Sequence, residues 1–190
     1  KPTLFQPGVD FCYFKSLYSV FQKAGEERHI WSKENPKEHF ASFFFSEDIR
    51  GRYSIANKPV FIRKLPVSNC DIICKERIYD LRVNLKSEVL VSDYIATEPP
   101  IYVRLHERWT FIYKNTWKYD FSKVSSGKTK ESACKSLPVF EVELELLRNN
   151  TVFLNESSTV IATNLVEKLI DLLGRFDENG DLFSYSLRVK

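Results

Sequence analysis

The chain has 190 residues, of which 43% are hydrophobic and 14% aromatic, and only 6 are glycine. This composition excludes a disordered or low-complexity protein and fits one domain with a substantial core. The 28 Lys and Arg residues against 25 Asp and Glu residues give a net charge of +3, which is too small to identify a nucleic-acid-binding protein by itself.

The sequence also lacks the marks of a secreted or membrane protein. No stretch approaches the ~20 apolar residues of a membrane span, and the first residues do not resemble a signal peptide. The four cysteines have neither zinc-ligand nor disulfide-framework spacing: Cys12, Cys70, Cys74 and Cys134. We therefore expect a single intracellular domain over residues 1–190, without a membrane partner.

The predicted elements begin with an amphipathic helix over residues 10–24. Asp10 can cap this helix, its apolar residues recur at helical spacing, and Gly25 follows as a stop signal. Residues 26–46 are rich in aromatic residues and are expected to pack in the core, partly as helix. Further along, apolar and polar residues alternate, which predicts strands at 51–56, 59–65, 70–76, 78–90, 101–114, 116–124 and 139–147.

Three more elements complete the prediction. A polar loop is expected at 125–132, a second helix at about 162–174, and a last strand at 182–189. The connections between the predicted strands are too short for crossover helices. The fold class is therefore expected to be α+β with a mostly antiparallel sheet.

Four of the predicted strands carry charge on one face. Glu141, Glu143 and Glu145 share one face of the 139–147 strand, opposite an apolar face. Alternate residues on a strand stand ~6.7 Å apart, so these carboxylates repel one another unless cations or basic side chains oppose them. Three other strands have mixed or basic polar faces: Arg104, His106, Arg108 and Thr110; Lys118, Asp120 and Ser122; Asp80, Arg82, Asn84, Lys86 and Glu88.

Two arrangements of these strands are open. An amphipathic strand is most simply explained by a sheet whose polar face meets water and whose apolar face covers a core. A β-barrel with the charges inside and the helices outside also explains why opposite charges are concentrated on separate strands. Its interior would suit a triphosphate, because Arg and Lys contact phosphate oxygens and carboxylates hold Mg²⁺ or Mn²⁺. The pattern thus favours a polyanion-binding, metal-dependent barrel.

These charged strands resemble those of a known family. Glu141-Val142-Glu143-Leu144-Glu145 is similar to the E-x-E-x-E strand of the metal-dependent RNA 5′-triphosphatases of fungi, protozoa and viruses. Arg104-x-His106-x-Arg108-x-Thr110-Phe111 is similar to their R-x-K-x-R-x-S-Y strand. Two further segments match an R-x-D-x-T strand and an earlier strand with an inward arginine: Lys118-Tyr119-Asp120-Phe121-Ser122 and Asp80-Leu81-Arg82-Val83-Asn84-Leu85. The resemblance implies the fold of that family, an antiparallel eight-stranded β-barrel called the triphosphate tunnel, with helices packed outside.

The resemblance also implies a reaction and a role for each matching residue. The reaction is hydrolysis of the γ-phosphate of 5′-triphosphate RNA to give 5′-diphosphate RNA, the first step of mRNA capping. Glu145 would bind Mg²⁺ or Mn²⁺, while Glu141 and Glu143 would bind the metal's waters, orient basic partners or position the attacking water. Asp120 would orient a basic neighbour. Phosphate contacts would come from Arg82, Arg104, His106, Arg108, Lys118 and Lys64.

Three departures from the family pattern are visible. His106 occupies a lysine position, and an imidazole that is neutral near pH 7 binds phosphate less strongly. Lys118 replaces an arginine and loses its bidentate fork. The family's first glutamate-rich strand, E-x-E, has no counterpart before Phe5. We therefore expect the native protein to carry this strand, with two further metal ligands, in an N-terminal extension.

Other functions remain open at this stage. The tunnel could act on free NTP, inorganic tripolyphosphate or thiamine triphosphate, which competition against RNA ends would reveal. The domain could also bind polyanions or RNA ends without catalysis, as the lack of the first glutamate-rich strand suggests. The capping role implies a nuclear location, with the 5′-triphosphate end of nascent RNA and an RNA guanylyltransferase as partners.

Overall fold

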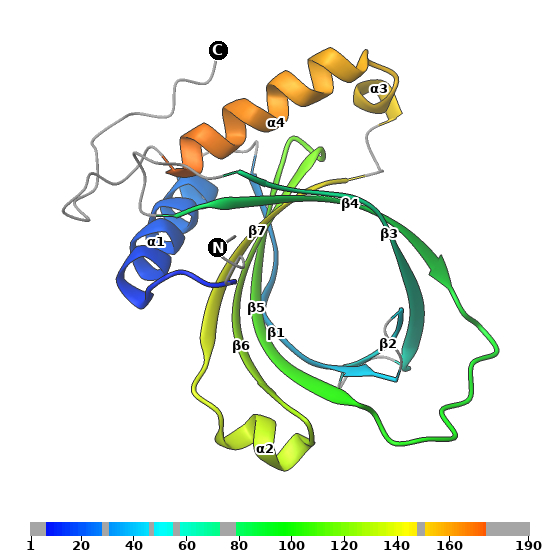
Figure 1. Cartoon of the computed structure of the whole chain (residues 1–190). Helices are drawn as coiled ribbons and strands as arrows, with labels where there is room; N and C mark the ends of the chain where they lie inside the picture. The colour runs from blue at the N-terminus through cyan, green and yellow to red at the C-terminus, as the bar shows by residue number, and fades with distance from the viewer. Residues whose placement is uncertain are drawn as a thin grey trace.

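A computed structural model of the chain describes residues 7–27, 31–45, 48–54, 58–72, 79–147 and 151–173. Its strands are β1 (Trp31–Phe44), β2 (Ile49–Ser54), β3 (Val60–Ile72), β4 (Leu81–Leu90), β5 (Tyr102–Tyr113), β6 (Trp117–Gly127) and β7 (Val139–Leu146). Its helices are α1 (Phe11–Glu27), α2 (Lys130–Lys135), α3 (Thr151–Leu154) and α4 (Ser158–Leu173). The strands form one antiparallel sheet in the order β4-β3-β2-β1-β5-β6-β7, which curls strongly and carries the helices on its outside (Figure 1).

The predicted elements agree with most of these bounds, with differences in several places. The second helix was predicted at about 162–174, whereas α4 begins at Ser158, and α3 was not predicted. Among the described residues of 26–46, helical structure is limited to the last turn of α1, which continues through Gly25 to Glu27. Trp31–Phe44 is a strand because it pairs with both β2 and β5. The predicted polar loop at 125–132 instead contains the end of β6 and the start of α2, which Thr129 caps. The predicted strands at 59–65 and 70–76 are joined in β3 up to Ile72, with a register shift beside Pro66, and residues 73–76 lie outside the described residues. The predicted strand at 182–189 lies outside the described residues.

The main core lies between α1 and the outer face of β5–β7. Asp10 caps α1 as predicted, because its side chain accepts the backbone N–H of Tyr13 at 2.8 Å. Leu17 of α1 and Phe111 and Phe121 of the sheet are fully buried. Burying side chains of this size stabilises a fold by about 1.5–3 kcal/mol each. The apolar faces of β5–β7 therefore point outward, beneath α1.

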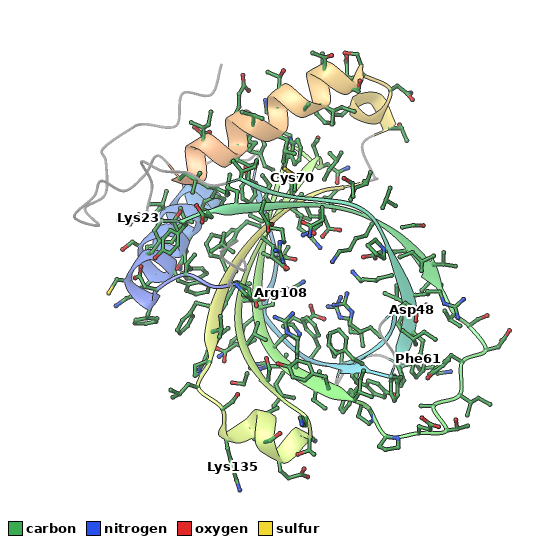
Figure 2. The ribbon with its side chains drawn as sticks, viewed as in Figure 1. Lys23, Asp48, Phe61, Cys70, Arg108 and Lys135 are labelled. Atoms are coloured by element: carbon green, nitrogen blue, oxygen red, sulfur yellow. The ribbon has the colours of Figure 1, made fainter. Side chains whose placement is uncertain are left out.

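The strand register places the polar faces on the inside of the curl. Arg108 of β5 pairs with Ser122 of β6, which pairs in turn with Glu141 of β7, so these three side chains lie on one face. Figure 2 shows Arg108 on the inside of the curled sheet, whereas Lys23 of α1 and Lys135 of α2 lie outside it. The inner face of the sheet is therefore the charged one, as the barrel interpretation requires.

The two edge strands of the sheet are β4 and β7. Beside the edge of β7, Val9 forms one antiparallel bridge, in which its backbone N–H donates to the carbonyl oxygen of Phe140 at 2.8 Å. Within the described parts of the chain, seven strands therefore form an incomplete barrel instead of the eight that were expected. None of the described helices is long and apolar enough to cross a membrane.

Candidate functional site

Arg108 is the centre of a polar cluster on the inner face of β5–β7. Its Nε donates to Ser122 Oγ at 2.9 Å, its Nη1 to Asp120 Oδ2 at 2.8 Å, and its Nη2 to Glu143 Oε2 at 3.1 Å. The side chain is 16% exposed. Acceptors on two neighbouring strands thus fix the plane of the guanidinium group, which remains partly accessible from inside the curl.

Asp120 is the buried anion of this cluster, with a relative exposure of 2%. Besides Arg108, it accepts a hydrogen bond from Thr110 Oγ1 at 2.7 Å and lies 3.3 Å from Lys118 Nζ. Lys118 Nζ also lies 2.5 Å from Glu145 Oε2. Burial opposes the charge of Lys118, but Asp120 and Glu145 outweigh it and raise the pKa of this lysine. Lys118 therefore stays positively charged at neutral pH.

The three glutamates of β7 differ in their surroundings. Glu141 accepts both of its bonds from Arg104 Nη2, at 2.6 and 2.7 Å, and its side chain is 13% exposed. The side chains of Glu143 and Glu145 are 53% and 58% exposed. Glu141 is therefore held in the wall of the curl, whereas the other two carboxylates also remain accessible to a ligand.

His106 is buried among these charges, with a relative exposure of 6%. Its ring stacks on Phe40 of β1 at 4.4 Å and 7°. Neither ring nitrogen has a hydrogen-bond partner among the described residues. Burial lowers the pKa of His106 to about 3, and Arg104, Arg108 and the two arginines of β2 add to this effect. The histidine that replaces the family's lysine is therefore neutral and adds no positive charge.

The depressed pKa of His106 predicts a loss of stability in acid. The pKa is about 3 in the folded protein against 6.5 in the unfolded chain, so only the unfolded chain gains a proton between pH 6.5 and 3. We expect the protonation of His106 in the unfolded chain to lower the free energy of unfolding by about 2 kcal/mol at pH 5 relative to pH 7. Urea unfolding at both pH values measures this, with His106→Gln as the control that stays neutral. Equal losses in the two proteins would contradict the prediction.

Lys64 and Arg82, the two phosphate-contact candidates of β3 and β4, form separate ion pairs. Lys64 pairs with Glu88, and its pKa is lowered because burial and the nearby Arg50 outweigh that partner. Arg82 Nε donates to Asp71 Oδ1 at 2.6 Å on the exposed ribbon of β3 and β4. The other predicted residues lie together on β5–β7, whereas Lys64 and Arg82 lie on the two strands at the opposite end of the strand order.

Two basic residues of β2 were not among the predicted site residues. Arg50 is partly buried, which lowers its pKa, and charges from β4, β5 and β7 act on it. Arg52 Nη2 donates to both carboxylate oxygens of Glu38 at 2.6 Å, and its guanidinium lies 4.1 Å from the ring of Phe40. The alternation in Arg50-Gly51-Arg52 was a usable signal. The predicted strand began at residue 51, one position too late to place both arginines on one face.

The described residues do not by themselves complete a metal site. Among them, no group of three or more His, Cys, Asp or Glu residues is placed to hold a metal ion. Glu145 is nevertheless suited to contribute, because its carboxylate is exposed and hard divalent cations prefer oxygen ligands. This chain's described part therefore offers one strong candidate ligand at the edge of β7.

Comparison with solved structures identifies the fold. The S. pombe Pct1 RNA triphosphatase matches with a TM-score of 0.71 and 16% identity over 88% of this chain and 70% of that one. The Mimivirus capping enzyme triphosphatase matches with a TM-score of 0.59 and 13% identity over 88% and 86% of the two chains. A structure of Pct1 with the Spt5 CTD gives a TM-score of 0.67 at 16% identity and the same coverages, 88% and 70%. Comparison of the sequence with curated proteins gave no match.

The family is established by the sequence itself. The family model of the mRNA capping enzyme, beta chain, matches residues 37–188, which include the charged strands β5, β6 and β7. The curled antiparallel sheet with its helices outside is the triphosphate tunnel fold of RNA triphosphatases. The chain therefore belongs to the mRNA capping enzyme beta chain family of RNA triphosphatases.

Proposed function

We propose that the inner face of this sheet removes the γ-phosphate from the 5′-triphosphate end of nascent RNA, which leaves 5′-diphosphate RNA for capping. The observation that carries the proposal is the Arg108 cluster, which fixes a guanidinium group by acceptors on β6 and β7 and keeps it partly accessible. Phosphoryl transfer depends mostly on positioned positive charge, because little covalent chemistry is required of the protein.

The phosphate contacts are assigned to basic residues of several strands. Arg104, Arg108 and Lys118 serve from β5 and β6, and Lys64 and Arg82 serve from β3 and β4. Arg50 is added to this set, because it lies partly buried on the inner face, where charges of β4, β5 and β7 act on it. His106 contributes a neutral hydrogen-bonding group in this assignment, since its depressed pKa removes the positive charge.

The acidic residues hold these cations and water in place. Asp120 orients Arg108 and Lys118, both of which lie within 3.3 Å of its carboxylate. Glu141 orients Arg104 through two hydrogen bonds. Glu143 is bonded to Arg108 and more than half exposed, which suits it to position the attacking water.

The metal is proposed to be Mg²⁺ or Mn²⁺, with Glu145 as one of its ligands. When bound, such a cation offsets the charge that builds up as water attacks phosphorus. The remaining ligands are assigned to a further glutamate-rich strand, which pairs with β7 and closes the barrel towards β4. The Val9 bridge supports a further strand at this edge, because the backbone of β7 already accepts an antiparallel partner at Phe140.

The partners proposed for this protein follow from the capping reaction. They are the 5′-triphosphate end of RNA and an RNA guanylyltransferase that uses the diphosphate product. A nuclear location is proposed on the same ground, because the family is that of an mRNA capping enzyme. The S. pombe Pct1 RNA triphosphatase has a solved structure in complex with the Spt5 CTD, and a protein partner of that kind is proposed for this chain as well.

The decisive experiment measures release of labelled γ-phosphate from 5′-triphosphate RNA by the full-length protein, with Mg²⁺ or Mn²⁺ and with a chelator. Metal-dependent release, with 5′-diphosphate RNA as the product, is the expected result. Unlabelled tripolyphosphate and NTP are added as competitors to compare small substrates with RNA ends. A well-folded protein that binds triphosphate RNA but releases no phosphate would be a binding module.

Glu145→Gln is expected to raise the metal concentration for half-maximal activity by at least about tenfold, because the amide lacks the negative charge of a carboxylate ligand. The matched control is Glu107→Gln, on the outer face of β5, where the carboxylate pairs with Lys37 and Lys123. Activity titrated with Mn²⁺ measures both variants. Identical metal curves for Glu145→Gln and the unmodified protein would remove Glu145 from the metal site.

A further inference from the structure

An exposed aromatic residue stands at one end of the inner face. Tyr102 is the first residue of β5, is 41% exposed, and shares the inner face with Arg104 by strand alternation. Its ring packs edge-on against Phe44 of β1, with ring centroids 6.0 Å apart at 63°. The guanidinium of Arg50 lies 5.7 Å from the ring of Phe44. Tyr102 thus sits where the charged face meets the solvent.

The strand directions place Tyr102 far from Glu145. β5 and β7 run parallel to each other, because both are antiparallel to β6. The first residues of β5 and β7 therefore lie at the same rim, and Glu145 lies towards the opposite one. Along β5, Arg108 and Tyr102 are six residues apart, which is about 20 Å at ~3.4 Å per residue. Arg104 lies between them and is bonded to Glu141.

The two ends of β5 differ in the inner residue that they offer. At the far end this residue is Ile112, which pairs with Lys118 and is only 6% exposed. At the near end it is Tyr102, which is accessible and aromatic. A nucleic-acid base stacks on an aromatic ring and gains little from a buried aliphatic side chain. The chemistry of the rims therefore distinguishes one end as suited to a base.

We propose that Tyr102 stacks against one of the first bases of the RNA and that the transcript leaves the tunnel at this rim. The inference rests on the proposed function, because it assumes a triphosphate whose γ-phosphate lies near Arg108 and Glu145. From there Arg104 and Arg50 continue the positive charge towards Tyr102, along the path of the β- and α-phosphates. Phe44 packs against the tyrosine ring from the side. Because every base can stack on an aromatic ring, this contact binds a base without sequence preference.

The test compares a substrate that has a base with one that has none. For Tyr102→Ala, the ratio of the KM for 5′-triphosphate RNA to the KM for inorganic tripolyphosphate is expected to rise by about 5- to 150-fold, the range of one base–aromatic stack. Tyr102→Trp is expected to restore the ratio, and Tyr102→Leu, which keeps an apolar side chain without a ring, is expected to behave like the alanine variant. Thermal unfolding of each variant accompanies the kinetics.

The outcomes separate this inference from the function on which it rests. A wild-type protein that hydrolyses both substrates, together with an unchanged KM ratio in Tyr102→Ala, overturns only the stacking role. The stacking role is also overturned if the KM ratio of Tyr102→Leu is as close to the wild-type ratio as that of Tyr102→Trp. Side-chain size alone would then explain the effect. A wild-type protein that hydrolyses neither substrate removes the proposed function and the inference together.

Discussion

Arg108→Ala is expected to lower kcat for γ-phosphate release by about 10²–10³-fold, the usual effect of removing one positioned donor from a charge-stabilising site. The guanidinium is held by Ser122, Asp120 and Glu143 and does not have to reorganise during the reaction. Charge that is fixed before the reaction stabilises the transition state more than mobile charge does. Single-turnover release of γ-phosphate, with saturating metal and RNA, measures the effect directly.

Two further variants make this experiment specific. Arg108→Lys keeps the charge but loses the planar fork, so it is expected to recover only part of the activity. Arg63→Ala removes an arginine that pairs with Asp48 at 3.1 Å and is 47% exposed, and little change is expected. If Arg108→Ala retained kcat within a few-fold of wild type, Arg108 would have a structural role in the sheet and no role in catalysis.

Asp120→Ala is expected to destabilise the folded protein by about 3–5 kcal/mol, the typical cost of removing one partner from a buried ion pair. The carboxylate is 2% exposed and is shared by Arg108, Lys118 and Thr110. Its removal leaves two cations facing each other across a buried space. Urea unfolding at pH 7 and moderate salt gives the change in the free energy of unfolding.

The size of this loss tests how the cluster is held together. Asp120→Asn keeps the shape and one acceptor, so a smaller loss is expected than for alanine. Asp71→Ala is the exposed control, because its partner Arg82 can return to water, and its stability is expected to stay close to wild type. A loss below about 1 kcal/mol for Asp120→Ala would show that Glu143 and Glu145 can replace the missing charge.

The charged strands were predicted closely because their pattern is local. In β5, β6 and β7 polar and apolar residues alternate with few interruptions. This alternation identifies the segments as strands, and it shows which face of each strand is apolar and buried. β1 was missed because its pattern is broken near Lys37, where the pairing with β5 shifts register and the backbone φ is 40°. Its strand structure depends on pairing with β2 and β5, and a short window of sequence does not contain that information.

The partners within the site were beyond the sequence for a different reason. Alternation tells which residues share a face, but not which of them touch across strands. Arg104 pairs in register with Ser126, yet it bonds to Glu141 of the next strand, because the curl of the sheet brings diagonal neighbours together. His106 stacks on Phe40 because the two residues are register partners on β1 and β5, a pairing that the sequence pattern did not contain. The residue type indicated an imidazole that is neutral near pH 7, and its surroundings lower the pKa further.

The ion pairs of the inner face also bear on how a substrate can enter and leave. Arg104, Arg108 and Lys118 each already hold a carboxylate of β6 or β7. A phosphate that arrives shares each cation with a carboxylate of the protein, so it meets positive charge that is already partly neutralised. The carboxylates remain in place when the product departs. Binding is thereby kept from becoming so tight that a highly charged product could not be released.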